Sequence, residues 1–198
     1  MAIFPPINPF KAIAELAELN TKLVKGSKQL SETKDADIEI ATTKKTCVYQ
    51  QDKVSLHHYD ALAEKTINTP VIVVYGLIGR YTMADLQEDR SLIRNMLNAG
   101  VDMYVVDWGS PSRAERWLTL EDYINGYLYD CIEHIKKTHN IDKVNILGIC
   151  EGGVFSTCYA ALYPDNVNNL MTSITPIDFH GDERDDRALV PSYGHPDI

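Results

Sequence analysis

The sequence predicts an α/β protein with a mainly parallel sheet. From Pro70 onward, short runs of β-branched and aliphatic residues alternate with longer segments of helical periodicity, a pattern typical of parallel strands joined by helices. The composition agrees, because 44% hydrophobic and 24% charged residues in a chain of 198 suit one globular domain. The alternation stops near Pro176, so we expect only the N-terminal portion of such a fold.

Residues 1–45 are expected to form a helical and polar extension. A polar run occupies residues 26–45, and the apolar residues before it recur at roughly helical spacing: Phe10, Ile13, Leu16, Ala17, Leu19, Leu23 and Val24. Either this helix packs on the domain, or it contacts a partner protein or a hydrophobic surface.

Residues 46–179 are expected to form the domain itself. The segment TCVYQQDKVSLHHYD predicts two antiparallel strands with a turn at 51–53. The expected parallel strands and their helices follow in alternation, with strands at 71–75, 103–107, 144–147 and 170–174 and helices at about 84–98, 120–138 and 152–162. Thr119 and Asp122 resemble a capping box, and Asn98, Gly100 and Asn140 mark helix ends. The acidic tail, 180–198, predicts no further strand or helix.

Charge and cysteine content exclude several functions. A net charge of −9 without a basic stripe argues against nucleic acid as a partner. The first residues lack a secretory pattern, and no apolar run is long enough to be a transmembrane segment, so we expect a cytoplasmic protein. The four cysteines form no CxxC pair and have no Cys/His ligand spacing, so we expect neither a metal site nor a disulfide framework.

The segment NILGICEGGVF, residues 145–155, predicts a nucleophile at Cys150. A strand runs directly into G-x-C-x-G-G and then a helix, which is the setting of a nucleophile elbow. Small neighbours are needed at this turn, and Gly148, Gly152 and Gly153 supply them. The helix N-terminus favours a thiolate, and the backbone N–H of Glu151 is placed to stabilise an oxyanion.

The alternative interpretations of this turn are a packing cysteine or a phosphate-binding loop. Neither GxGxxG nor GK[ST] is complete here, which argues against phosphate. Cys47, Cys131 and Cys158 are interpreted as packing residues. The segment YGLIGR, residues 75–80, is either the loop that supplies a second oxyanion donor or an ordinary turn with glycines.

Several motifs together resemble a known family. They are VYGLIGRYTMADLQEDRS at 74–91, VVDWGSP at 105–111, TLEDYINGY at 119–127 and DKVNILGICEGG at 142–153. Between about residues 46 and 179 the chain resembles the catalytic subunit of polyhydroxyalkanoate synthases, most closely the class III, two-subunit type. The resemblance implies an α/β-hydrolase-type sheet.

The resemblance also implies an activity. Family members are acyltransferases that polymerise (R)-3-hydroxyacyl-CoA, such as 3-hydroxybutyryl-CoA, into polyhydroxyalkanoate and release CoA. By resemblance, Cys150 is the nucleophile and the amides of Glu151 and Ile78 form the oxyanion hole. No cofactor is implied. The implied partners are a second synthase subunit and the surface of cytoplasmic storage granules.

The family's catalytic histidine and aspartate are expected beyond residue 198. His195 and Asp178 are weaker substitutes, and His180 is expected in a surface loop. The remaining histidines precede the elbow and are expected to pack or face solvent: His57, His58, His134 and His139. Candidate cations for the anionic CoA are Arg80, Arg90, Arg113 and Arg116.

Two other functions fit the same residues. The elbow cysteine could hydrolyse small esters or lactones, as in dienelactone hydrolases, and acid release without polymer would identify that reaction. A non-catalytic remnant could instead bind the partner subunit or a granule. That interpretation predicts no substrate turnover by the 198 residues.

Overall fold

The computed structural model describes residues 9–34 and 39–178, and the chain divides into two compact units, Met1–Ile40 and Ala41–Ile198. The first unit holds the predicted N-terminal helix, α1 (Pro9–Glu32). The polar run was expected to begin at residue 26, but the helix continues through it to Glu32. Within the described residues, no helix has both the length and the apolar character needed to cross a bilayer.

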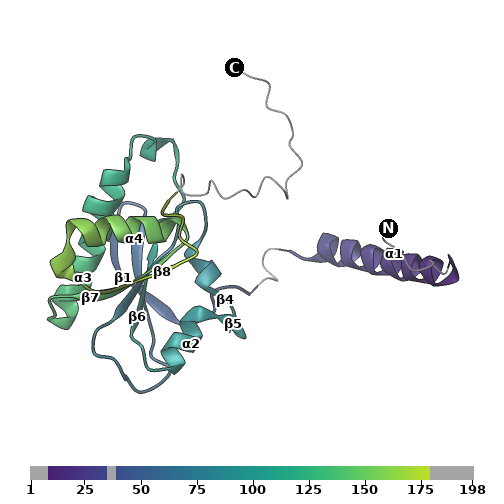
Figure 1. Ribbon diagram of the computed structural model, residues 1–198, viewed down its shortest axis with the longest axis horizontal. Coiled ribbons are helices and arrows are strands. Elements are labelled where there is room, and N and C mark those ends of the chain that lie inside the picture. The colour runs from purple at the N-terminus through teal and green to yellow at the C-terminus, as the bar shows by residue number, and fades with distance from the viewer. Residues whose placement is uncertain (1–8, 35–38, 179–198) are drawn as a thin grey trace, which may run out of the picture. The chain divides into compact units, whose positions relative to one another are not determined.

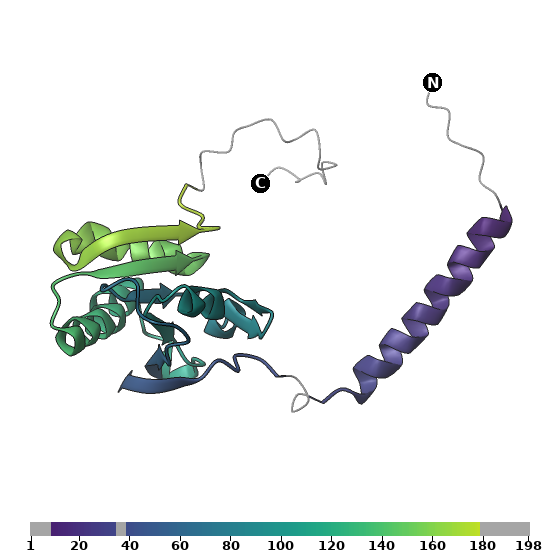
Figure 2. The same ribbon diagram turned by 90° about the horizontal axis from the view of Figure 1, so that it is seen from below.

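The second unit is built on a six-stranded sheet in the order β1-β2-β6-β3-β7-β8 (Figures 1 and 2). The strands are β1 (Lys45–Gln51), β2 (Val54–Tyr59), β3 (Val71–Val74), β6 (Met103–Asp107), β7 (Val144–Ile149) and β8 (Val167–Ser173). The strands from β6 to β8 pair in parallel, whereas β1 and β2 form the predicted antiparallel edge. The carboxyl ends of β3, β6, β7 and β8 therefore meet at one edge of the sheet.

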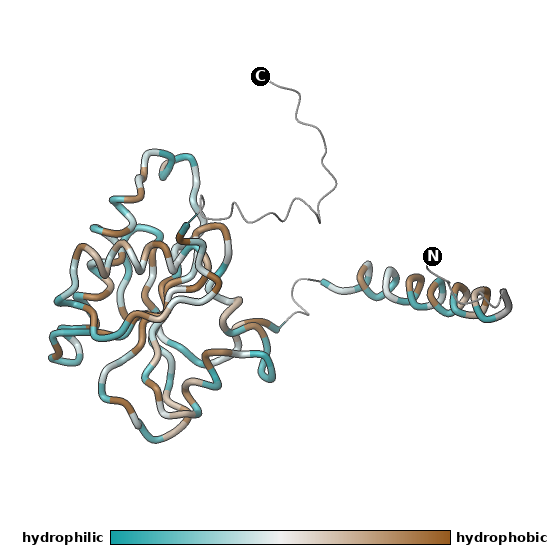
Figure 3. Tube along the Cα trace, in the orientation of Figure 1, coloured by the Kyte–Doolittle hydropathy of each residue, from teal (hydrophilic) through white to brown (hydrophobic). Residues whose placement is uncertain are grey.

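Alternating strand residues build two cores, one on each face of the sheet. Ile72, Val74 and Ile146 pack with residues of α3 (Tyr129–His139) and α4 (Glu151–Leu162). Val71 and Val73 pack on the opposite face with residues of α2 (Leu92–Asn98). Figure 3 shows hydrophobic residues along the central strands between these helices. This burial on both faces explains why the strands read as nearly continuous apolar runs.

The expected helix at 84–98 is wrong in its first half. That segment holds the short helix η2 (Tyr81–Ala84), and a hairpin of β4 (Asp85–Gln87) and β5 (Arg90–Ser91) precedes α2. The carboxylate of buried Asp85 accepts hydrogen bonds from the hydroxyls of Thr43 and Ser91, both at 2.6 Å. The Ser91 hydroxyl also accepts the N–H of Arg94 and caps α2.

The expected helix at 120–138 is present, and its ends follow the predicted signals. The N–H and hydroxyl of Thr119 donate to Asp122 at 2.7 and 2.8 Å. The helix passes through a π-helical stretch, η4 (Asp122–Leu128), before α3. It stops at Asn140, whose φ of 51° is left-handed. Two further 3₁₀ turns are η3 (Arg113–Glu115) and η5 (Pro164–Asn166).

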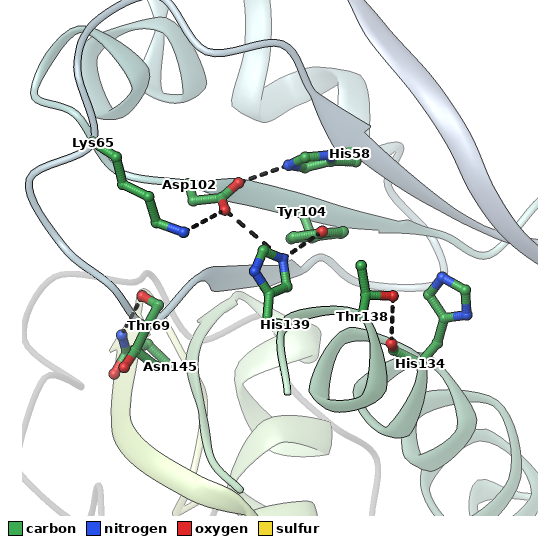
Figure 4. Close-up of polar contacts among 9 residues, drawn as sticks. All are labelled: His58, Lys65, Thr69, Asp102, Tyr104, His134, Thr138, His139 and Asn145. Carbon is green, nitrogen blue, oxygen red and sulfur yellow. Dashed lines mark hydrogen bonds and ion pairs between the residues drawn. The ribbon is translucent and has the colours of Figure 1, made fainter. Parts of the chain in front are cut away.

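A polar cluster lies at the amino end of the sheet, centred on Asp102 (Figure 4). One carboxylate oxygen lies 2.6 Å from Nε2 of His58, and the other accepts from Nζ of Lys65 at 3.0 Å. Nε2 of His139 lies 2.8 Å from the Tyr104 hydroxyl and 3.8 Å from the carboxylate. Burial raises the pKa of Asp102, but the hydrogen bonds from His58 and Lys65 outweigh it and hold the pKa at about 2. We call these five residues the Asp102 cluster.

Candidate active site

Cys150 connects the carboxyl end of β7 to the first residue of α4. Its φ of 56° and ψ of −129° are rare for a residue with a side chain. Its own N–H donates to the carbonyl of Ser173 at 3.0 Å, and its carbonyl accepts the N–H of Gly153 at 2.9 Å. The thiol is exposed. The turn therefore lifts the sulfur out of the sheet at the edge where the parallel strands end.

The three predicted elbow glycines lie where a side chain would collide with the backbone or a neighbour. A Cβ on Gly148 would lie 2.5 Å from Cα of Gly153. One on Gly152 would overlap the carbonyl oxygen of Val74, and one on Gly153 would overlap the hydroxyl of Thr175. Strand β7, helix α4 and strand β3 approach closely here, so the small residues are a geometric requirement of the turn.

A pocket of about 590 Å³ opens over the Cys150 thiol, within the usual size range of small-molecule sites. The loop after β3 contributes Gly76 and Ile78 to its lining, and Cys150 lines it together with the start of α4. Leu120 and Pro176 complete the lining. Most of the lining residues are apolar, so the pocket suits an acyl chain better than a free phosphate.

The loop after β3 is held by two hydrogen bonds at its start. The indole N–H of Trp108 donates to the carbonyl of Tyr75 at 2.8 Å, and the N–H of Leu77 donates to the Glu151 carboxylate at 2.8 Å. Trp108 is itself buried edge-on against Tyr123 and Phe155. Sequence reasoning missed both anchoring side chains. An acidic residue directly after the nucleophile was a usable signal for Glu151, whereas the sequence near Trp108 gives none.

The two expected oxyanion donors come from different elements, the first turn of α4 and the loop after β3. The Glu151 amide is the first of α4, and the first amides of a helix have no partner within it. Ile78 lines the pocket from the loop, with its side chain exposed. Because the Leu77 amide is occupied by Glu151, the next loop amide, that of Ile78, remains our candidate for the second donor.

The four histidines before the elbow have other partners. His57 stacks on Tyr81 and lies 3.8 Å from Asp107, and His134 lies against Tyr49. His58 and His139 belong to the Asp102 cluster. His180 and His195 lie outside the described residues. Asp178 is exposed near the end of the described part of the chain.

The other cysteines differ from one another in exposure. Cys131 is fully buried, and burial raises the pKa of its thiol to about 12. Cys158 is half-buried beside the same core. The expectation that Cys47 packs is wrong, because its side chain is exposed on β1 and its thiol contacts the Tyr49 carbonyl at 3.4 Å. An edge strand has fewer neighbours to cover such a residue.

The candidate CoA-binding cations are spread over the surface. Arg80 directly follows the pocket-lining Gly79, whereas Arg90 lies on β5 and Arg113 on η3. The guanidinium of Arg116 lies 5.1 Å from the ring of Trp117. Because Arg80 adjoins a pocket-lining residue in the chain, we keep it as the first candidate for binding CoA.

Two family models match the chain. The model described as the alpha/beta hydrolase fold matches residues 69–194, and the model of the N-terminus of poly-beta-hydroxybutyrate polymerase (PhaC) matches residues 11–96. A solved structure of a putative lipase from Sulfolobus solfataricus is similar with a TM-score of 0.56 at 14% identity, over 84% of this chain and 53% of that one. The chain therefore belongs to the α/β hydrolase fold family, and the predicted fold class is confirmed.

Within that family, the similar curated proteins are poly(3-hydroxyalkanoate) polymerase subunits. Identity to the PhaC subunit of Synechocystis is 42% over 90% of this chain and 47% of the relative. The subunit of Thiocystis violacea is 47% identical over 87% of this chain and 48% of the relative. The subunit of Allochromatium vinosum is 44% identical over 89% of this chain and 50% of the relative. The sequence is thus similar to poly(3-hydroxyalkanoate) polymerase subunits over most of its own length. The chain spans about half the length of these relatives.

Proposed function

We propose that the chain carries the acyl-accepting half of a poly(3-hydroxyalkanoate) synthase site, with Cys150 as the nucleophile. The substrate class is (R)-3-hydroxyacyl-CoA. The observation that carries this proposal is the exposed thiol at a positive-φ turn between β7 and α4, facing a largely apolar pocket. The names of the curated relatives support the same chemistry.

The proposed reaction has two transfers. The Cys150 thiolate attacks the thioester carbonyl carbon, a carbon–sulfur bond forms, and the amides of Glu151 and Ile78 stabilise the resulting oxyanion. When the bond to the CoA sulfur breaks, CoA leaves as a thiolate and takes up a proton. The 3-hydroxyl of another unit then attacks the acyl-enzyme, loses its proton, and displaces the Cys150 sulfur to form an ester.

A thiol suits this exchange. Transfer between two sulfur atoms is nearly balanced in energy, so the acyl group is not trapped on the enzyme. The unpaired N–H groups and the dipole at the N-terminus of α4 also favour the negative charge that develops on the attacked carbonyl oxygen. The family resemblance assigns proton transfer to a histidine oriented by a carboxylate, and our proposal gives that role to none of the described histidines.

Labelled 3-hydroxybutyryl-CoA tests the proposal on the chain itself. We expect one label per chain, located on Cys150 by peptide mass analysis, with release of CoA. Cys150→Ala removes the label, while Cys47→Ala, which removes another exposed thiol, retains it. A folded chain that takes no label on Cys150 contradicts the proposal. Release of free hydroxy acid instead of a stable or extended acyl chain identifies an ester hydrolase.

We extend the proposal to the partners and location that the class III resemblance implies. These are a second synthase subunit and the surface of storage granules in the cytoplasm. Co-purification of α1-containing chain with the partner subunit tests the first, and sedimentation with isolated granules tests the second. Binding without any acylation identifies the non-catalytic alternative.

A further inference from the structure

The side chain of Glu151 crosses from the helix to the loop after β3. Its Oε2 atom accepts the N–H of Leu77 at 2.8 Å, between residues 74 positions apart in the chain. The approach depends on Gly76, because a Cβ there would lie 3.1 Å from both Cβ and Oε2 of Glu151. The residue after the nucleophile and the candidate oxyanion loop are thus joined directly.

Two features hold the segment after β3: the Leu77 side chain packs against the core, and the Leu77 N–H makes this hydrogen bond. Gly76 has no side chain, and the side chain of Ile78 is 97% exposed, so it cannot fix the loop by packing. The second hydrogen bond, from Trp108 to Tyr75, acts one residue before Gly76. The orientation of the Ile78 amide therefore depends on the packing of Leu77 and on the hydrogen bond between Leu77 and Glu151.

The negative charge of Glu151 is not what the loop requires. An amide donor needs only an oxygen acceptor, and a carboxamide supplies one. A carboxylate next to a thiolate is electrostatically unfavourable, since like charges repel. The useful property of the side chain is its length and its acceptor oxygen.

On the basis of the proposed function, we propose that the Glu151 side chain is a positioning residue for the oxyanion hole. By accepting the Leu77 N–H, it orients the loop so that the next amide, that of Ile78, faces the carbonyl of an acyl group on Cys150. The backbone amide of Glu151 then donates to the oxyanion directly, and its side chain acts on the same oxyanion by positioning the Ile78 amide.

A pair of matched variants separates the acceptor from the charge. Glu151→Gln and Glu151→Met have similar length and both remove the charge, but only glutamine supplies an oxygen acceptor for the Leu77 N–H, since a thioether sulfur accepts only weakly. Two rates are measured for Cys150 in each: acylation by 3-hydroxybutyryl-CoA and alkylation by iodoacetamide. Alkylation is a displacement at a saturated carbon and forms no oxyanion, so it reports on the thiol alone.

We expect Glu151→Met to acylate roughly 10-fold or more slowly than Glu151→Gln, because a misplaced donor loses part of the 10²–10³-fold that a whole donor is worth. The alkylation rates of the two variants should agree within about 2-fold, since both keep the thiol and lack the charge. Equal acylation rates in the two variants overturn the proposal, whether both match the unaltered chain or both fall below it. If both fall equally, the charge of Glu151 acts on the reaction and its acceptor oxygen does not.

Hydrogen exchange of the Leu77 amide tests the inference without any reaction. The amide should exchange roughly 10-fold faster or more in Glu151→Met than in Glu151→Gln, because its acceptor is gone. Unchanged exchange overturns the positioning role. If the unaltered chain takes no acyl group but Leu77 exchange responds as expected, the proposed function fails while the structural link stands.

Discussion

The two ends of the parallel sheet use polar residues in opposite ways. At the amino end, the Asp102 cluster pairs its charged and aromatic groups with one another beside a hollow of about 350 Å³. At the carboxyl end, a larger pocket of about 590 Å³ opens over an exposed thiol on a strained turn. Groups that are already paired stabilise the fold, whereas groups left open can act on a ligand.

The largest effect is expected from adding a methyl group at the carboxyl end. Gly152→Ala should lower the free energy of unfolding by roughly 3 kcal/mol or more, because the new Cβ would overlap the carbonyl oxygen of Val74 in β3. Urea denaturation followed by circular dichroism measures this change.

Gly126→Ala is the matched control for that substitution. A Cβ at Gly126 meets nothing within 4 Å, and the residue lies in the helical stretch η4. We expect this variant to be unchanged or to gain about 0.5–1 kcal/mol, because alanine loses less entropy than glycine in a helix. Equal destabilisation by both substitutions would show that the elbow is no tighter than an ordinary helix.

A smaller effect is expected at the amino end. Asp102→Ala should destabilise the chain by about 2 kcal/mol, since hydrogen bonds to a charged group contribute about 1.5–3 kcal/mol and His58 and Lys65 both lose their partner. The alkylation rate of Cys150 should not change. Asp142→Ala, an exposed carboxylate shortly before β7, should stay within about 0.5 kcal/mol of the unaltered chain. Slower alkylation of Cys150 in Asp102→Ala would contradict the division of roles between the two ends of the sheet.

The smallest expected effect is the pH dependence of the stability that the Asp102 cluster contributes at the amino end of the sheet. The folded pKa of Asp102 is about 2, below its ordinary 3.8, so its contribution is complete above pH 3.8 and is lost as the pH falls through about 2. Between pH 6 and pH 3 the chain should lose about 1 kcal/mol from this carboxylate. The burial that lowers the pKa of His139 acts in the same direction below pH 6.5, because the unfolded chain then binds more protons.

Asp102→Asn isolates that contribution. Other carboxylates titrate in both proteins, so the difference between their free energies of unfolding, measured by urea denaturation, should narrow by about 1 kcal/mol when the pH falls from 6 to 3. A difference that stays constant over this range would mean that the cluster does not hold the carboxylate ionised.

Local sequence was sufficient where the structure is set by local demands. Strands β3, β6 and β7 followed from runs of residues buried on both faces, and the elbow followed from small residues spaced around Cys150. The hairpin at 85–91 was missed because Asp85 bonds to Thr43, 42 residues away. The side-chain role of Glu151 was missed for the same reason, since its partner lies on another strand's loop.

The bend at Cys150 is set by the backbone and by the glycines around it, and the sulfur atom contributes nothing to its shape. A serine there would occupy nearly the same space, so the scaffold can exchange a soft nucleophile for a hard one without being rebuilt. A single-atom change therefore switches this turn between thiol and hydroxyl chemistry, and selection for the reaction alone can fix either atom.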